Sequence, residues 1–281
     1  MSNSNGNYYH LVSQRSQPVS APPKLERCSQ VLCRLRPGLG TLVAVEAEAR
    51  LDSIAQQGIS AAFEAVARVE RLMHPSRIGS DLAALAVTPC GTSLAVHPWT
   101  WEVLELCQRL NVLSRGIFDP CLDVSPGRMR DLELAQSYHV VPHSRLTVDL
   151  GGVAKGYAVD RALEALRDAG CDGGLVNAGG DLAVFGARGH KIVCRVGGDA
   201  SAVVELHNSA LATSDVASPD RPVEHRGYYH GADRGAVISG NVTVMAASAA
   251  VADALTKCLL SGDHSLNQTL LDAFEATQIQ T

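Results

Sequence analysis

The segment Thr147–Asp160 (TVDLGGVAKGYAVD) combines a glycine turn with charged residues in a spacing that suits the binding of an anion. Its first residues predict the end of a strand, Gly151 and Gly152 predict a tight turn, and apolar spacing from Tyr157 onward predicts a helix. The N–H groups of such a turn and of the first helical turn lack internal partners and carry partial positive charge. A phosphate group is therefore the expected ligand of this segment.

Asp149 and Lys155 add two charges to this turn. Lys155 lies in the first helical turn, where the helix dipole disfavours a cation by roughly 0.3 to 1 kcal/mol. A negative charge is therefore expected near it, from Asp149 or from a bound phosphate. Asp149 ends the predicted strand, where residues of open α/β structures often contact ligands. These residues alone leave two alternatives open, a ligand site and an ion pair that fastens the turn.

Two further carboxylates stand in distinctive surroundings. Asp119 lies between Phe118 and Pro120, and an aspartate before a proline often only sets a turn. Asp253 lies in a strongly apolar helical segment, where a carboxylate has to be neutralised. A metal ion would do this, and so would Lys257, which stands four residues further along the same helix.

The composition indicates an ordinary globular protein and argues against several classes of partner. The chain has 281 residues, 46% of them hydrophobic, and a net charge of -5 without a long basic run, so nucleic acid and membrane surfaces are not expected partners. No apolar run is long enough to span a membrane. Residues 1–27 lack the apolar core of a signal peptide and predict a disordered lead-in, which favours a cytoplasmic location. Eight scattered cysteines without a C-x-x-C pair predict buried, reduced thiols.

The elements that must position these residues alternate irregularly between strands and helices. Strands are predicted within 34–47, on both sides of the glycines at 179–180, as a hairpin over 191–207 and at 242–245. Helices are predicted up to Pro75, after a cap at Ser80, over 97–115, from the glycine turn to Gly170, and over 247–260. This order predicts an α+β fold, with residues 28–281 as a single domain in which long helices pack on a mixed or antiparallel sheet.

Six strings together resemble one known family. They are VDLGGVAKGYAVD, GGLVNAGGD, GIFDP, PGLGTLV, SDLAAL and ADALTKCLL, and they extend from about Arg34 to Leu260. Their content and order resemble the FAD:protein FMN transferases, the ApbE family once described as thiamine-biosynthesis lipoproteins. The resemblance implies FAD as substrate, Mg²⁺, and transfer of FMN to a Thr or Ser hydroxyl of an acceptor protein, with release of AMP.

The resemblance also implies roles for individual residues. Asp149 and Lys155 match contacts to the flavin nucleotide, and the segment Ile117, Phe118 and Asp119 matches a further contact to the flavin. The Gly152 carbonyl and the Asp253 carboxylate match metal ligands, with Thr256 as a further candidate, and His230 is the candidate catalytic base.

The chain departs from the family pattern at four places. HGADRG keeps the spacing of His230 and Asp233 but lacks the usual Pro and Thr, and Leu39 replaces a methionine. Lys257 stands where a metal-ligating Thr is common, so a lysine charge in place of the metal is left open. The usual lipoprotein signal is not seen in this sequence, so a short, non-lipoprotein variant of the family is expected.

Two other functions remain as alternatives at this stage. One is hydrolysis of the FAD pyrophosphate at the same site, with water in place of the acceptor hydroxyl. The other is a binding or structural protein that keeps the fold without catalysis, which Lys257 and the altered HGADRG loop favour. The sequence does not identify the acceptor protein or the oligomeric state.

Overall fold

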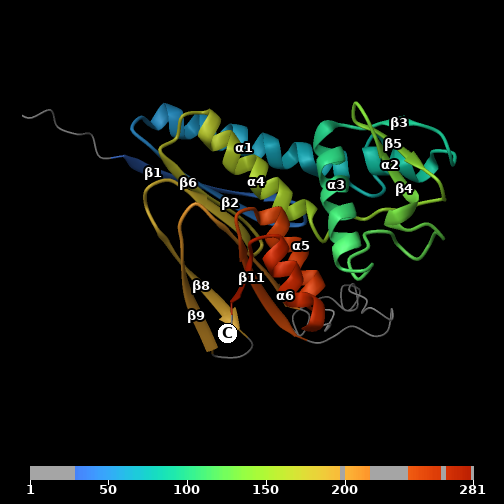
Figure 1. The fold of residues 1–281 in the computed structure, drawn as a ribbon. Coiled ribbons are helices and arrows are strands. Elements are labelled where there is room, and N and C mark those ends of the chain that lie inside the picture. The colour runs from blue at the N-terminus through green and yellow to red at the C-terminus, as the bar shows by residue number, and fades with distance from the viewer. Residues whose placement is uncertain (1–28, 197–199, 216–239, 261–263, 280–281) are drawn as a thin grey trace, which may run out of the picture.

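The computed structural model describes residues 29–196, 200–215, 240–260 and 264–279. Its main element is a seven-stranded sheet in which every neighbouring pair is antiparallel. In spatial order the strands are β1 (Gln30–Gly38), β2 (Thr41–Ala49), β6 (Gly173–Ala178), β7 (Asp181–Phe185), β10 (Ala210–Asp215), β11 (Asn241–Ala246) and β12 (Thr277–Ile279). This antiparallel sheet and the helices on it confirm the predicted α+β class (Figure 1).

Three helices cover one face of this sheet in a row. The helix α1 (Asp52–Met73) packs on β2, α4 (Ala154–Asp168) packs on β6 and β7, and α5 (Ala249–Leu260) packs on β10 and β11. The helix α4 also contacts α1 on one side and α5 on the other (Figure 1). A fourth helix, α6 (His264–Ala273), packs against α5. The main hydrophobic core lies between these helices and the sheet.

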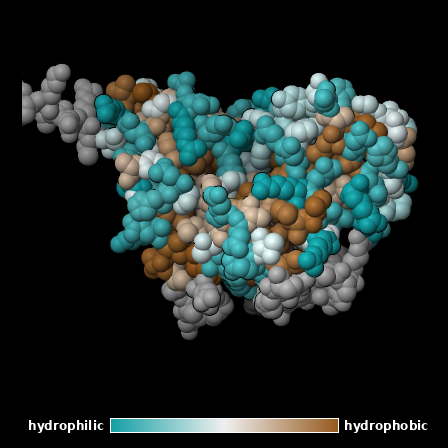
Figure 2. All heavy atoms as spheres, in the orientation of Figure 1, coloured by the Kyte–Doolittle hydropathy of each residue, from teal (hydrophilic) through white to brown (hydrophobic). Residues whose placement is uncertain are grey.

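A separate hairpin covers part of the opposite face. It consists of β8 (His190–Val196) and β9 (Ala200–Leu206), and it shares a second hydrophobic cluster with β7 and β10. Its outer face is less covered, because the cross-strand pair Val193 and Val203 is 62% and 64% exposed. Figure 2 shows that hydrophilic residues occupy much of the visible surface, with apolar patches between them.

The strand β7 is buried along its whole length, and its two faces meet different cores. Leu182 and Val184 belong to the cluster under the hairpin, whereas Ala183 and Phe185 belong to the core under the helices. Side chains alternate along a strand, so Asp181 points to the same side as Ala183 and Phe185. The first residue of β7 is therefore a buried carboxylate that faces the helices.

A small lobe lies beside the seven-stranded sheet and its helices (Figure 1). Its sheet has the order β3 (Leu94–Ala95), β5 (His139–Pro142) and β4 (Leu132–Ala135), and its helices are α2 (Asp81–Val87), α3 (Pro98–Leu113) and a 3₁₀ turn η1 (Met129–Asp131). The predicted cap at Ser80 is confirmed, because its hydroxyl oxygen accepts the Ala83 N–H at 3.1 Å.

The helices α4 and α5 approach each other very closely at Gly156. A Cβ atom at this position would overlap the Ala249 carbonyl and lie 2.8 Å from the Ala250 Cα. Further along α4, the Asp160 carboxylate accepts the Ala249 N–H at 2.8 Å, the Ala250 N–H at 2.9 Å and the Ser248 hydroxyl at 2.8 Å. A side chain of α4 therefore caps the N-terminus of α5, and the two helices are fixed to each other.

Several predicted elements need correction. The apolar residues before Gly151 form no strand within the described ranges, only a single bridge between Cys121 and Val148, because an apolar run also suits a buried loop. The strand predicted within 34–47, behind a glycine turn, is confirmed as β2, but its partner β1 on the other side of the turn was not predicted. The turn residues Leu39 and Gly40 both have positive φ (54° and 71°). The elements β12 and α6 were not predicted, since both are short.

The other predictions of the sequence have mixed outcomes. The predicted helix after the glycine turn is α4, and Gly170 (φ 86°) follows its C-terminus. Seven cysteines within the described ranges are free, of which five are buried and two, Cys33 and Cys90, are exposed. No helix in these ranges is long and apolar enough to cross a membrane. The lead-in 1–27 lies outside the described residues, and the domain limits and the cytoplasmic location stay predictions.

The α4–α5 contact predicts that Gly156→Ala destabilises the protein. Its new Cβ overlaps backbone atoms of α5, and overpacking of this kind costs about 1 to 3 kcal/mol of unfolding free energy. The matched control is Gly152→Ala, whose Cβ would have its nearest neighbour at 3.6 Å, so a change within about 0.5 kcal/mol is expected. Urea unfolding followed by circular dichroism measures both, and equal losses would contradict the close-contact argument.

Candidate functional site

The turn between β6 and β7 brings a buried carboxylate to the N-terminus of α4. Gly179 and Gly180 form this turn with φ of 66° and 103°, a conformation that glycine adopts without strain. Asp181 follows at once and is 1% exposed. Its Oδ2 atom forms an ion pair with the Lys155 ammonium, whose side chain is 33% exposed. The predicted anion-binding lysine is therefore held in place by a carboxylate of the sheet.

A second ion pair lies on α5. Asp253 is fully buried, and its Oδ1 atom pairs with the ammonium of Lys257, one helical turn further on. The other carboxylate oxygen accepts the Gly156 N–H at 3.2 Å. The side chain of Lys257 is only 8% exposed. The structure thus confirms the ion pair that the spacing of Asp253 and Lys257 predicted.

The two ion pairs form one electrostatic unit, which we call the two-lysine cluster (Lys155, Asp181, Asp253 and Lys257). Burial and the nearby Asp253 charge raise the pKa of Asp181 to about 6, and the attraction of Lys155 and Lys257 offsets only part of this effect. The charges of the two carboxylates therefore repel each other, and the charge of each lysine lowers the pKa of Asp181. The cluster combines two cations and two anions, and all of these side chains except Lys155 are buried.

Hydroxyl groups fix the cluster to the neighbouring strand. The Thr256 hydroxyl donates to the Asp253 carbonyl at 2.6 Å, and its oxygen lies 2.7 Å from the Ser214 hydroxyl. Because the Thr256 proton is already used, Ser214 is the donor in the second bond. Both side chains are buried. The predicted metal ligand Thr256 therefore has a structural bonding pattern that links α5 to β10.

Gly152 lies between an aromatic ring and the stem of Lys257. An ideal Cβ on Gly152 would be 3.6 Å from the Lys257 Cγ atom, 3.7 Å from the Phe118 ring and 3.8 Å from the Lys257 Cε atom. Residues from three separate parts of the sequence therefore meet here. The structure brings together five predicted site residues, which are Phe118, Gly152, Lys155, Asp253 and Thr256.

The remaining predicted site residues are Asp149, Asp119, Ile117 and His230, and the structure describes the first three. The Asp149 carboxylate accepts the Gly151 N–H at 2.8 Å, and the Asp119 carboxylate accepts the Cys121 N–H at 3.0 Å and the Met129 N–H at 3.3 Å. Both carboxylates thus shape loops, and their ligand contacts stay predictions. Ile117 is half-buried and packs against the core. The candidate base His230 lies outside the described residues.

Sequence reasoning missed Asp181 and Ser214. The sequence does point to Asp181, because this charged residue directly follows two glycines and precedes an apolar strand. It is therefore expected at a turn, where the strand begins. Its partner Lys155 lies 26 residues earlier, which no local pattern connects. Ser214 gave no such signal, since its partner Thr256 is 42 residues away.

The residues at the predicted metal position do not fit a divalent cation in this arrangement. One Asp253 oxygen pairs with Lys257, the other accepts a backbone N–H, and the Thr256 hydroxyl is engaged. A dication about 4 Å from the ammonium would be repelled by about 8 kcal/mol at an effective dielectric constant of about 20. Within the described residues, no group of three His, Cys, Asp or Glu side chains could hold a metal.

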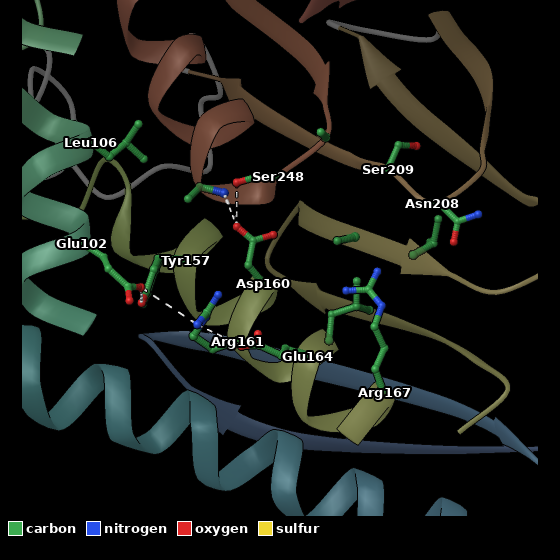
Figure 3. A pocket seen from close by; sticks show the side chains of 15 residues that line it. Glu102, Leu106, Tyr157, Asp160, Arg161, Glu164, Arg167, Asn208, Ser209 and Ser248 are labelled. Carbon is green, nitrogen blue, oxygen red and sulfur yellow. Dashed lines mark hydrogen bonds and ion pairs between the residues drawn. The ribbon is translucent and has the colours of Figure 1, made fainter. Parts of the chain in front are cut away.

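A pocket of about 320 Å³ lies on the other side of α4 (Figure 3). With about 100° per residue, Tyr157, Asp160, Arg161 and Glu164 lie roughly opposite to Lys155. Most polar groups here bond to one another, since Arg161 pairs with Glu164 at 2.9 Å, Tyr157 donates to Glu102, and Asp160 caps α5. The buried Arg161 Nε atom has no hydrogen-bond partner within the described residues. None of the predicted site residues lines this pocket. We therefore place the candidate site at the two-lysine cluster.

Comparison with known proteins gives relatives of one kind. An FAD:protein FMN transferase from Rhodobacter capsulatus is 26% identical in an alignment of 182 residues, and the match covers 54% of this chain and 34% of that protein. The matched part thus spans about a third of that relative. 

Solved structures show the same fold. The flavinyl transferase ApbE of Pseudomonas stutzeri in its apo form has a TM-score of 0.75 at 18% identity, covering 89% of this chain and 90% of that chain. The flavin transferase ApbE of Vibrio cholerae has a TM-score of 0.76 at 20% identity, covering 89% of this chain and 93% of that chain. At such identities the likeness concerns the fold.

The family itself follows from the sequence match. A model described as the ApbE family matches residues 39–125 and 123–276, which together are most of the chain. This range includes the glycine turn, the whole two-lysine cluster and both helices that carry it. The chain belongs to the ApbE family.

Proposed function

We propose that this protein transfers FMN from FAD to a Thr or Ser hydroxyl of an acceptor protein and releases AMP. The observation that carries the proposal is the two-lysine cluster beside the glycine turn at the N-terminus of α4. The curated relative from Rhodobacter capsulatus, an FAD:protein FMN transferase, supports the same reaction.

The N-terminus of α4 supplies what a pyrophosphate requires. The N–H groups of the first helical turn and the helix dipole favour an anion, and Lys155 adds a full positive charge there. The Lys155 side chain is part-exposed while its partner Asp181 is buried, so this ion pair lies between the core and the surface. This arrangement favours a phosphate oxygen as the further partner of the lysine.

The reaction itself needs positioning and charge neutralisation more than covalent help. The acceptor hydroxyl oxygen forms a bond to the phosphorus on the FMN side of FAD, and the bridging P–O bond breaks. AMP leaves with the electron pair, and the hydroxyl proton passes to a base. The proposal assigns that role to His230, and it assigns nucleotide contacts to Ile117, Phe118, Asp119, Asp149 and Lys155.

Mg²⁺ assistance is the family expectation, with Gly152, Asp253 and Thr256 as ligands. Magnesium prefers several oxygen ligands in near-octahedral geometry. The carboxylate of Asp253 and the hydroxyl of Thr256 are already bonded within the protein. No step of the reaction is therefore assigned to a metal in this chain.

The proposal predicts a covalent product. Incubation of the protein with FAD and an authentic acceptor subunit should yield an acceptor that fluoresces as a flavoprotein on a denaturing gel and is heavier by one FMN unit, with one AMP per product. A control acceptor with alanine in place of its target hydroxyl residue should stay unmodified. AMP release without any acceptor would instead indicate FAD hydrolysis, and FAD binding without either product would indicate a binding protein.

The role of Lys155 predicts that Lys155→Met weakens FAD binding. Loss of a charge-assisted contact worth about 1.5 to 3 kcal/mol lowers affinity about 10- to 100-fold. The matched control is Lys191→Met, because Lys191 is an exposed lysine of the β8–β9 hairpin. Titration of FAD, followed by flavin fluorescence, measures both affinities. Equal affinities for the two variants would remove Lys155 from the site.

A further inference from the structure

Lys257 lies beside both groups that the family pattern implies as metal ligands. Its ammonium pairs with the Asp253 carboxylate, and its Cγ and Cε atoms would lie 3.6 and 3.8 Å from a Cβ placed on Gly152. The lysine therefore lines the space between the carboxylate of α5 and the glycine turn. A cation is present at this position as part of the chain.

The surroundings hold Lys257 in this place. The side chain is 8% exposed, and the carboxylate that it neutralises is completely buried. Displacement of the ammonium would leave Asp253 charged and unpaired in the core, which is strongly unfavourable. The same carboxylate accepts the Gly156 N–H, so its orientation is fixed by the contact between α4 and α5.

The charges near the cluster also favour a resident lysine over a dication. Lys155 belongs to the same cluster, because the charges of both lysines lower the pKa of Asp181. Addition of a doubly charged ion would place three cationic centres beside two carboxylates. A lysine ammonium has three N–H donors and can bond a carboxylate and a phosphate oxygen together.

We propose that Lys257 replaces the divalent metal in this protein, so that FAD binds at the two-lysine cluster without Mg²⁺. The inference rests on the proposed function, which supplies FAD as the ligand. Lys155 from α4 and Lys257 from α5 then neutralise the pyrophosphate from two sides. This makes Lys257 a nucleotide-binding residue of the site.

The test is a titration of FAD into the full chain in two buffers, one with EDTA and one with excess Mg²⁺, followed by flavin fluorescence. The dissociation constants should agree within about twofold, well below the tenfold change that one strong contact produces. Affinity that rises tenfold or more with Mg²⁺ overturns the inference and leaves the proposed function intact. Absence of FAD binding in both buffers overturns the proposed function and the inference with it.

A variant makes the test sharper. Lys257→Thr restores the hydroxyl of the family pattern beside Asp253, so FAD affinity in EDTA should fall about tenfold or more and return with Mg²⁺. The matched control Lys191→Thr should bind FAD as the unmodified protein does in both buffers. Unchanged affinity of Lys257→Thr in EDTA would overturn the inference.

A second measurement does not depend on that variant folding. Thermal unfolding of the unmodified protein without FAD should give the same Tm in EDTA and in Mg²⁺, because a metal that binds the folded state would raise it. A reproducible rise in Tm with Mg²⁺ that Asp253→Asn abolishes would show a metal site at Asp253 and overturn the inference.

Discussion

The contact between α4 and α5 at Gly156 is the constraint on which the candidate site depends. Any side chain at this position would enter the backbone of α5, so only glycine lets the two helices meet. Their closeness brings the Gly156 N–H to the Asp253 carboxylate and lets Asp160 cap α5. Two helices whose bonded residues Gly156 and Asp253 are 97 residues apart in sequence thereby share one charged cluster.

Buried charges are costly, and this cluster is therefore better explained by binding than by stability. Removal of four charged groups from water is only partly compensated by their mutual attraction. The raised pKa of Asp181 reflects that incomplete compensation. An anion at the exposed side of Lys155 would add the negative charge that the helix N-terminus and two lysines favour. The arrangement thus resembles a preorganised receptor more than a structural ion pair.

Local patterns predicted the parts of this site that lie within one element. The period of α4 and the pair of Asp253 with Lys257 both follow from spacings of three or four residues. Partners from different elements did not follow, because the pairing of Lys155 with Asp181 depends on how α4 crosses the sheet. The strand expected before Gly151 was wrong for a related reason, since an apolar run does not distinguish a strand from a buried loop.

A lysine and a magnesium ion are different solutions to the same electrostatic problem. The ion brings two charges and a rigid ligand geometry, but it must be bound from solution and keeps several waters. The ammonium of Lys257 brings one charge, and it is present whenever the protein is folded. In the proposed reaction, stabilisation of the leaving AMP depends more heavily on Lys155 and on the dipole of α4, because these supply the positive charge that a single ammonium lacks. Both lysines lie close enough to Asp181 to lower its pKa, which is why the proposal assigns them to one pyrophosphate.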